Sequence, residues 1–273
     1  MAEIAVSTRA AAIPAHGPRV RLRLLDGFRL EVGSVVIEPA ASLQRLLAFL
    51  ALRHYAVQRG YAAGFLWLDV PDHRAAGNLR SALWRLRRLG APVVAARGST
   101  IRLHPDVSVD LHQASQSARR WMAGLVTDRD LDAGVAAFES DLLPDWYDEW
   151  VVSERERFRQ LRLHALEAIA ERHIASERYG DALLAALAAV VADPLRETAH
   201  RVLIRVHLAE GNASEAIRQV RRCERLLRDE LGVSPSTRLA ELFASSHASA
   251  SALRPGAPHS IGVPFAAGRR SSV

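Results

Sequence analysis

The sequence predicts a mainly α-helical protein in which a small N-terminal α+β domain precedes an all-α domain. Two patterns support this fold class. Residues 19–110 alternate between strand-like and helix-like segments, whereas the rest has helical periodicity almost throughout. The chain has 273 residues, 49% of them hydrophobic, which is enough for two domains that each bury a core. We expect a disordered tail at 1–18, the α+β domain at 19–108, the all-α domain at 109–246 and a second disordered tail at 247–273.

The α+β domain combines short strands, three helices and a final hairpin, which is the order of a winged helix-turn-helix. Residues 19–38 alternate apolar with polar residues and turn at Asp26-Gly27 and Gly33-Ser34, which predicts antiparallel strands joined by hairpins. Residues 42–54 predict a helix that Ser42 caps, with leucines along one face. The other expected elements are a short helix over 58–67, a proline-containing loop at 68–74, a third helix through 78–90 and two strands around the turn at 97–99.

The third helix has two sides of different chemistry. At about 100° per residue, Leu79, Leu83 and Leu86 fall on one side, which we expect to face the core. The opposite side is cationic and rich in hydrogen-bond donors, and no Asp or Glu occurs between residues 73 and 105. Like charges on one helix face repel each other, so such a face suggests an anionic partner. Its expected members are Arg74, Gly77, Ser81, Arg85 and Arg88, with Asn78 and Trp84 at its edges and Arg80 and Arg87 on its flank.

Two interpretations of this basic face remain open. One is an ordinary solvated surface, although such surfaces usually mix charges of both signs. The other is the major groove of DNA, where Arg and Asn side chains pair with guanine and adenine edges. The following turn adds Arg97 and Arg102 around small residues, which allow close approach to a phosphate backbone or minor groove. The charge distribution favours DNA, because residues 19–110 hold 14 arginines against 7 acidic residues, and residues 111–246 hold 18 against 22.

The all-α domain contains an internal repeat. Residues 173–183 align with residues 207–217 at an offset of 34, which pairs His173 with His207 and Ala182 with Ala216. This is the period of tetratricopeptide-type helical hairpins, in which small residues let paired helices approach closely. The stacked helices would form a surface that is more suited to protein contact than to catalysis.

The composition argues against several functional classes. All 36 basic residues are arginine, so the usual P-loop, a Schiff-base lysine and a kinase-type ATP lysine are excluded. The single cysteine excludes an internal disulfide and fits a reducing compartment, and we find neither a secretory signal nor a membrane-spanning run. We therefore expect a cytoplasmic protein without membrane contact. Because no nucleophile–base pair, metal cluster or phosphate loop is visible, we expect no enzyme, no cofactor and no metal.

One segment mimics a calcium-binding loop. Asp128, Asp130, Asp132 and Glu139 occupy its first, third, fifth and twelfth positions, but Ala133 stands where the loop requires glycine. The alternative to calcium binding is that these acidic residues lie in the first turn of a helix, where they interact favourably with its N-terminus.

Three further features admit two interpretations each. Neighbouring arginines could lower the pKa of Cys223, or the thiol could be buried by helix packing. The aromatic cluster at 146–150 could stack a ligand or could lock helices together. Four histidines could be zinc ligands but lack the spacing of a zinc site, and such residues more often pack in the core or face solvent. They are His164, His173, His200 and His207.

These motifs resemble a known family of bacterial regulators. "NLRSALWRLRRLG" (78–90) followed by "RGSTIRL" (97–103) resembles the winged-helix DNA-binding domain of OmpR/PhoB-type response regulators. Residues 140–246, notably "DPLRETAHRVLIRVHLAEGNASEAI" and "RDELGVSPSTRLAEL", resemble the bacterial transcriptional activator domain. The two in tandem resemble the Streptomyces antibiotic regulatory protein family over roughly residues 20–246.

The resemblance implies a sequence-specific activator of a biosynthetic gene cluster. It implies a homodimer that binds direct repeats in double-stranded promoter DNA and contacts RNA polymerase. Asn78, Ser81 and Arg85 would face bases, and Arg97 would reach the minor groove. The remaining DNA contacts would come from Arg74, Arg80, Arg87, Arg88, Ser99, Thr100 and Arg102, and the polymerase-contact loop would comprise Leu68, Asp69, Val70, Pro71, Asp72 and His73. A protein-interaction scaffold that docks on nucleic acid without sequence preference remains the alternative.

Overall fold

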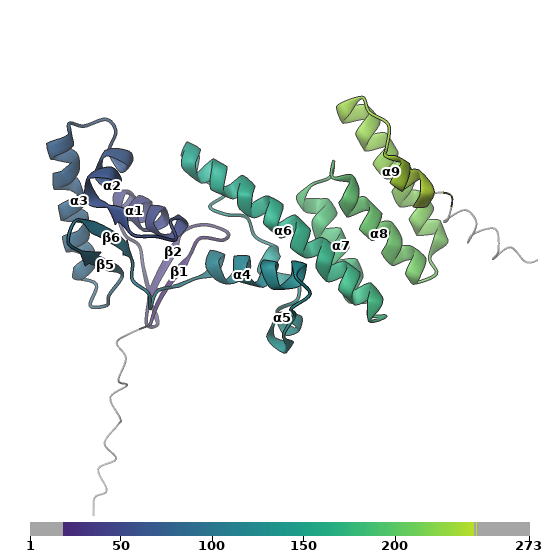
Figure 1. Ribbon diagram of the computed structural model, residues 1–273, viewed down its shortest axis with the longest axis horizontal. Coiled ribbons are helices and arrows are strands. Elements are labelled where there is room, and N and C mark those ends of the chain that lie inside the picture. Colours follow the sequence, from purple (N-terminus) through teal and green to yellow (C-terminus); the bar gives the residue numbers. More distant parts are fainter. Residues whose placement is uncertain (1–18, 243, 245–273) are drawn as a thin grey trace, which may run out of the picture. The chain divides into compact units, whose positions relative to one another are not determined.

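The computed structural model describes residues 19–242 and 244. The two predicted tails, 1–18 and 247–273, lie outside the described residues. Helices dominate, and two small sheets lie near the N-terminal end of the described chain (Figure 1). The predicted fold class is therefore confirmed.

The chain divides into two compact units, Met1–Arg172 and His173–Val273. The division falls inside the long helix α6 (Glu149–Ala175). The predicted boundary between residues 108 and 109 lies within the first unit.

A four-stranded sheet begins the first unit, in the order β3-β2-β1-β7. β1 runs antiparallel to β2, with Leu22 opposite Leu30, and parallel to β7. The turn between β1 and β2 places Asp26 at a φ of 63° and Gly27 at 115°, and Gly33 at 63° begins the next turn, so both predicted hairpins are confirmed. The strands are β1 (Val20–Arg23), β2 (Arg29–Val32), β3 (Val35–Ile37) and β7 (Ser108–Val109).

Three helices and a second sheet complete the predicted winged helix-turn-helix. The second sheet has the order β4-β6-β5. The first helix begins earlier than expected, because the carbonyl of Ala40 accepts hydrogen bonds from Leu43 and Gln44; Ser42 therefore lies inside the first turn and does not cap the helix. These elements are α1 (Ala41–Leu52), β4 (Val57–Gln58), α2 (Arg59–Leu66), α3 (Asp72–Arg87), β5 (Val94–Arg97) and β6 (Thr100–Leu103).

The core of the first unit extends well past residue 108. Leu142, Leu143, Val151 and Phe158 are buried in the same cluster as the leucines of the first sheet and of α1. Trp146 stacks on Phe28 with ring centroids 6.1 Å apart, so the aromatic cluster fastens this later segment to the earlier sheet. The intervening elements are α4 (Asp110–Met122), α5 (Asp128–Ala133) and the short 3-10 helix η1 (Ala136–Phe138).

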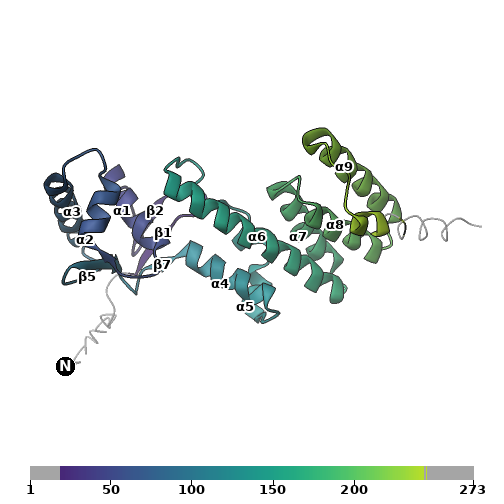
Figure 2. The same ribbon diagram turned by 45° about the horizontal axis from the view of Figure 1, so that its top comes forward.

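The second unit repeats a helical hairpin. Figures 1 and 2 show its helices α7, α8 and α9 side by side. The turn at Glu177 is matched 34 residues later by that at Gly211, with φ values of 57° and 85°. The backbone hydrogen bond from Arg178 to His173 likewise recurs from Asn212 to His207, at 2.9 and 2.7 Å, which confirms the predicted repeat. The bounds are α7 (Tyr179–Ala192), α8 (Glu197–Ala209) and α9 (Ala213–Leu231).

Candidate nucleic-acid interface

Helix α3 is fixed in the first unit by one apolar face. It begins at Asp72, after Pro71, whose carbonyl accepts the backbone N–H groups of Arg74 and Ala75. Its inner side chains recur at helical spacing and are buried in the core, which confirms the predicted orientation. Leu83 is only partly buried but packs against the same core. The buried inner residues are Ala75, Leu79, Ala82 and Leu86.

The outer face of α3 carries the predicted basic residues. Of the residues expected there, only Gly77 is partly covered; the others are exposed. None of the five arginines on this face forms an ion pair within the described chain. By contrast, α6 shows the usual mixed pattern, with Arg157 3.0 Å from Glu154 and Arg159 2.8 Å from Glu156. The exposed residues are Arg74, Asn78, Arg80, Ser81, Trp84, Arg85, Arg87 and Arg88.

One contact on this face was not predicted. The guanidinium carbon of Arg88 lies 4.8 Å from the centroid of the Trp84 ring, which is a cation–π distance. The Trp84 side chain is 57% exposed, so the pair lies at the surface. Their i,i+4 spacing in the sequence was the signal that could have indicated this contact.

The wing is the β5–β6 hairpin, which Figure 1 shows beside α3. Arg97 and Thr100 are cross-strand partners at its end, and Gly98 adopts a φ of 56° in the turn. The Thr100 hydroxyl donates to the carbonyl of Arg97 at 2.9 Å. The backbone N–H of Arg59, at the start of α2, donates to the carbonyl of Ser99 at 2.8 Å. The turn is thus held from two sides.

The wing side chains alternate between core and solvent. Ile101 is buried, whereas Arg97, Ser99 and Arg102 are exposed and Thr100 is half-buried. Neither wing arginine has an ion pair within the described chain. α3 and the wing therefore present seven cationic side chains without acidic partners.

The predicted polymerase-contact loop is shorter than expected. α2 ends at Leu66 and α3 already begins at Asp72, so Asp72 and His73 belong to the first turn of α3. Leu68 is 79% exposed, whereas Val70 packs against the core. Asp69 and Pro71 are exposed as well.

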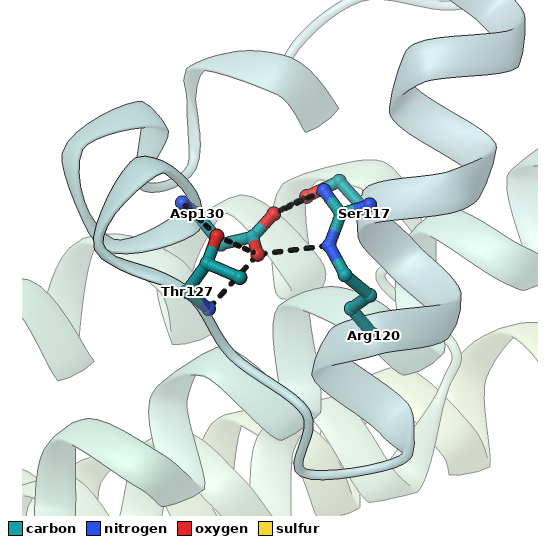
Figure 3. Close-up of polar contacts among 4 residues, drawn as sticks. All are labelled: Ser117, Arg120, Thr127 and Asp130. Atoms are coloured by element: carbon teal, nitrogen blue, oxygen red, sulfur yellow. Dashed lines mark hydrogen bonds and ion pairs between the residues drawn. The ribbon is translucent and has the colours of Figure 1, made fainter.

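The segment that mimics a calcium loop is engaged in internal contacts. Figure 3 shows the Asp130 carboxylate between Arg120, Ser117 and Thr127. Thr127 and Asp130 form a reciprocal capping box at the start of α5, as expected if the acids serve a helix N-terminus. The pKa of Asp130 lies below its usual value, and the hydrogen bonds from Arg120 lower it more than any other contact. Within the described residues, no three His, Cys, Asp or Glu side chains are placed to hold a metal ion.

The remaining candidates for chemistry lie in packed surroundings. Burial raises the pKa of Cys223 to about 12, so of the two interpretations helix packing is confirmed and a lowered pKa is wrong. His200 is buried, with Nε2 2.8 Å from the carbonyl of Pro194 and Nδ1 2.6 Å from the Gln219 amide. Burial also lowers the pKa of His200. Within the described chain, no helix has the length and apolar character needed to cross a membrane.

Comparison with known proteins assigns the family. The family described as bacterial transcriptional activator domain matches residues 106–245. The chain belongs to this family. It is 26% identical to the regulatory protein AfsR of Streptomyces griseus over 248 residues, which are 86% of this chain and 25% of AfsR. It is 28% identical to AfsR of Streptomyces coelicolor over 227 residues, which are 80% and 22%.

A solved structure shows the same fold. The structure of Mycobacterium tuberculosis EmbR in complex with a low-affinity phosphopeptide aligns with a TM-score of 0.70 at 24% identity, over 85% of this chain and 65% of EmbR. The chain spans about a quarter of the length of the curated relatives it matches. Together these matches support the resemblance to Streptomyces antibiotic regulatory proteins.

Proposed function

We propose that this regulator binds double-stranded promoter DNA in a sequence-specific manner, with α3 in the major groove and the wing at the adjacent backbone. The observation that supports the proposal is the set of seven exposed arginines on α3 and the wing, without acidic partners in the described chain. Arg and Asn side chains recognise guanine and adenine edges, which gives Asn78, Ser81 and Arg85 the role of base contacts. Their positions one turn apart, at i, i+3 and i+7, give them a common exposed face.

The other basic residues fit phosphate contacts. Arg80, Arg87 and Arg88 lie beside the base-contacting residues, and Arg74 lies in the first turn of α3. Arg97, at the tip of the wing, is assigned to the minor groove, with Ser99, Thr100 and Arg102 beside it. Phosphate contacts supply affinity and register, whereas base contacts supply sequence preference.

We further propose that the regulator activates transcription of a biosynthetic gene cluster by binding direct repeats as a homodimer and by contacting RNA polymerase. The exposed Leu68 lies next to the acidic Asp69, and Asp72 follows at the start of α3. This combination of an apolar group with negative charge suits contact with a basic protein surface. We retain the proposal that residues 19–108 act as the DNA-binding domain and residues 109–246 as the activator domain.

The proposal is tested by competition between DNA sites. The full chain is used to select its preferred duplex, and binding is then challenged with random duplex at physiological salt. A sequence-specific regulator keeps a preference of at least about a thousandfold. Arg85→Ala should reduce that preference, at a loss of about 1–3 kcal/mol. The control is Arg119→Ala, which removes an exposed arginine of the first unit that lies on α4. Equal binding of both duplexes, or a preference unchanged by Arg85→Ala, would contradict the proposal.

A second candidate function is a protein-interaction scaffold that docks on nucleic acid without sequence preference. It is favoured by α7, where Leu184, Leu187 and Val191 are 58%, 42% and 79% exposed along one side of the helix. Exposed apolar side chains at helical spacing suit contact with a protein. The competition experiment separates the candidates, because a scaffold of this kind would lose its bound duplex to random competitor.

A further inference from the structure

A second concentration of arginines lines a groove in the first unit. The groove has a volume of about 1110 Å³ and lies between the β1–β2 strand pair and the segment that runs from α4 to η1. Figure 1 shows α4 leading away from the strands, with α5 next to α4. The cationic side chains in its lining are Arg19, Arg21, Arg23, Arg29, Arg120 and Arg129.

Strand geometry brings three of these arginines together. The burial pattern of β1 alternates, so Arg21 and Arg23 face the same side of the sheet, away from the core. The register places Arg23 directly opposite Arg29 on β2. Like charges directly opposite each other destabilise a strand pair. Glu31 forms ion pairs with two of them, 3.4 Å from Arg21 and 3.5 Å from Arg23, and Asp110 also interacts electrostatically with Arg23. The strand pair therefore carries an excess of positive charge.

Two of the carboxylates that line the groove are already bound. Asp130 is held by Arg120, as described above. Asp110 accepts the backbone N–H groups of Leu24 at 2.9 Å, Leu25 at 3.1 Å and Leu111 at 2.7 Å.

The third lining carboxylate, Asp26, is exposed. Arg19, Arg29 and Arg129 form no ion pair within the described part of the chain. Positive charge is thus left available along the groove.

The remaining walls suit a phosphorylated ligand. Gln116, on α4, adds an amide donor, whereas the Gln113 amide already donates to the Ser108 hydroxyl at 2.9 Å. The small residues Ala133, Ala136 and Ala137 also line the groove. The planar guanidinium group matches two phosphoryl oxygens at once. The volume lies slightly above the range of small-molecule sites, which span about 300–1,000 Å³. A duplex presents its phosphates on a convex surface, so a concave groove favours a small molecule.

We propose that this groove binds a small molecule carrying at least two phosphoryl groups, which contact Arg23, Arg29 and Arg129. The floor belongs to residues 19–108 and the walls belong largely to residues after 109. A ligand would therefore bridge the proposed DNA-binding and activator domains, and could couple them as an effector. Only this regulatory consequence rests on the proposed function; ligand binding itself does not.

Isothermal titration of the full chain with sodium tripolyphosphate, and separately with adenosine triphosphate, tests the proposal. We expect saturable binding of one molecule per chain. Arg29→Glu and Arg129→Glu should each weaken it at least about tenfold, because each replaces an attractive charge by a repulsive one. Arg119→Glu is the matched control, since this arginine is exposed on α4 but does not line the groove, and it should change affinity less than about twofold. Thermal unfolding checks that every variant is folded like the parent.

The basic face of α3 is the competing site for any polyanion. Arg85→Ala distinguishes the two, because it should leave tripolyphosphate binding unchanged. The proposal is overturned if neither probe binds saturably, if Arg119→Glu weakens binding as much as Arg29→Glu, or if Arg85→Ala abolishes binding. Tripolyphosphate binding in a chain that shows no preferred DNA site would support the groove while contradicting the proposed function.

Discussion

Arg120 binds both carboxylate oxygens of Asp130, through Nε at 2.9 Å and Nη2 at 2.5 Å. Asp130 is 2% exposed, whereas the Arg120 side chain is 30% exposed. The pair joins the last turn of α4 to the first turn of α5, as Figure 3 shows. Because the acid is buried and also caps α5, this ion pair should matter more to folding than the surface pairs of α6.

Asp130→Asn should lower the free energy of unfolding of the first unit by about 2 kcal/mol, since it removes charge-assisted hydrogen bonds from a buried group. Urea unfolding at pH 7 measures the change. Glu156→Gln is the control, because Glu156 is 54% exposed in its pair with Arg159. The control should lower stability by less than about 1 kcal/mol. Equal effects of the two substitutions would contradict the structural role of Asp130.

The stabilisation by Asp130 should depend on pH in one direction. Its folded-state pKa is held below the ordinary value of 3.8, chiefly by Arg120. A depressed pKa contributes stability that is fully present above the unfolded-state pKa and disappears as the pH falls through the folded-state pKa. The difference in unfolding free energy between the parent and Asp130→Asn should therefore be constant from about pH 7 to 5 and narrow below about pH 4. Urea titrations across this range test it; a difference that grows on acidification would reverse the assignment.

Arg97→Ala should weaken binding to every duplex by a similar factor. Arg97 lies at the wing turn and is exposed, so its assigned contact is with the backbone and minor groove rather than with base edges in the major groove. The slope of log K against log salt should become smaller by about 1, as expected for the loss of one phosphate contact. Fluorescence anisotropy at several salt concentrations measures both quantities. Loss of preference for one site without a change in slope would assign Arg97 to base recognition.

Gly98→Ala and Gly60→Ala should change stability in opposite directions. Neither Cβ would meet an atom within 4 Å, so backbone conformation decides the result. Gly98 has a φ of 56°, where alanine is strained by about 1–2 kcal/mol. Gly60 lies in helix α2 without positive φ, so alanine should stabilise by about 0.5–1 kcal/mol. Thermal unfolding of both variants provides the comparison, and stabilisation by Gly98→Ala would contradict the described turn.

Cys223 should resist alkylation in the folded protein. Burial keeps the thiol protonated, with a pKa of about 12, and thiolate is the reactive form. Iodoacetamide at pH 8 should label the chain rapidly in denaturant and only at the rate of local opening in buffer. Mass spectrometry follows the label, and rapid labelling of the folded chain would show that the thiol is accessible.

The sequence was sufficient to predict the elements that have their own periodicity. Leu79 and Leu86 marked the inner face of α3, and the 34-residue repeat located the paired turns at Glu177 and Gly211. It was not sufficient for β4 and β7, which are two residues long and exist through pairing with distant strands. Local propensity carries little information about such strands.

The groove could not be predicted either. The arginines on β1 and β2 were visible in the sequence, but their relationship depends on register. Arg23 faces Arg29 only because the strands pair in one of several possible alignments. The assignment of Ser42 as a helix cap was wrong for a similar reason, since the start of a helix is set within one or two residues by backbone bonds.

The Trp146–Phe28 stack has a practical consequence for dissecting the regulator. A fragment ending at residue 108 would lack Leu142, Leu143, Val151 and Phe158, all of which are buried against the strands and helices that precede it. Such a fragment would expose the hydrophobic surface that these residues cover, and it would tend to aggregate. The two halves of the first unit should unfold in a single transition. Chimaeras of related regulators should therefore transfer residues up to 158 together with the DNA-binding half.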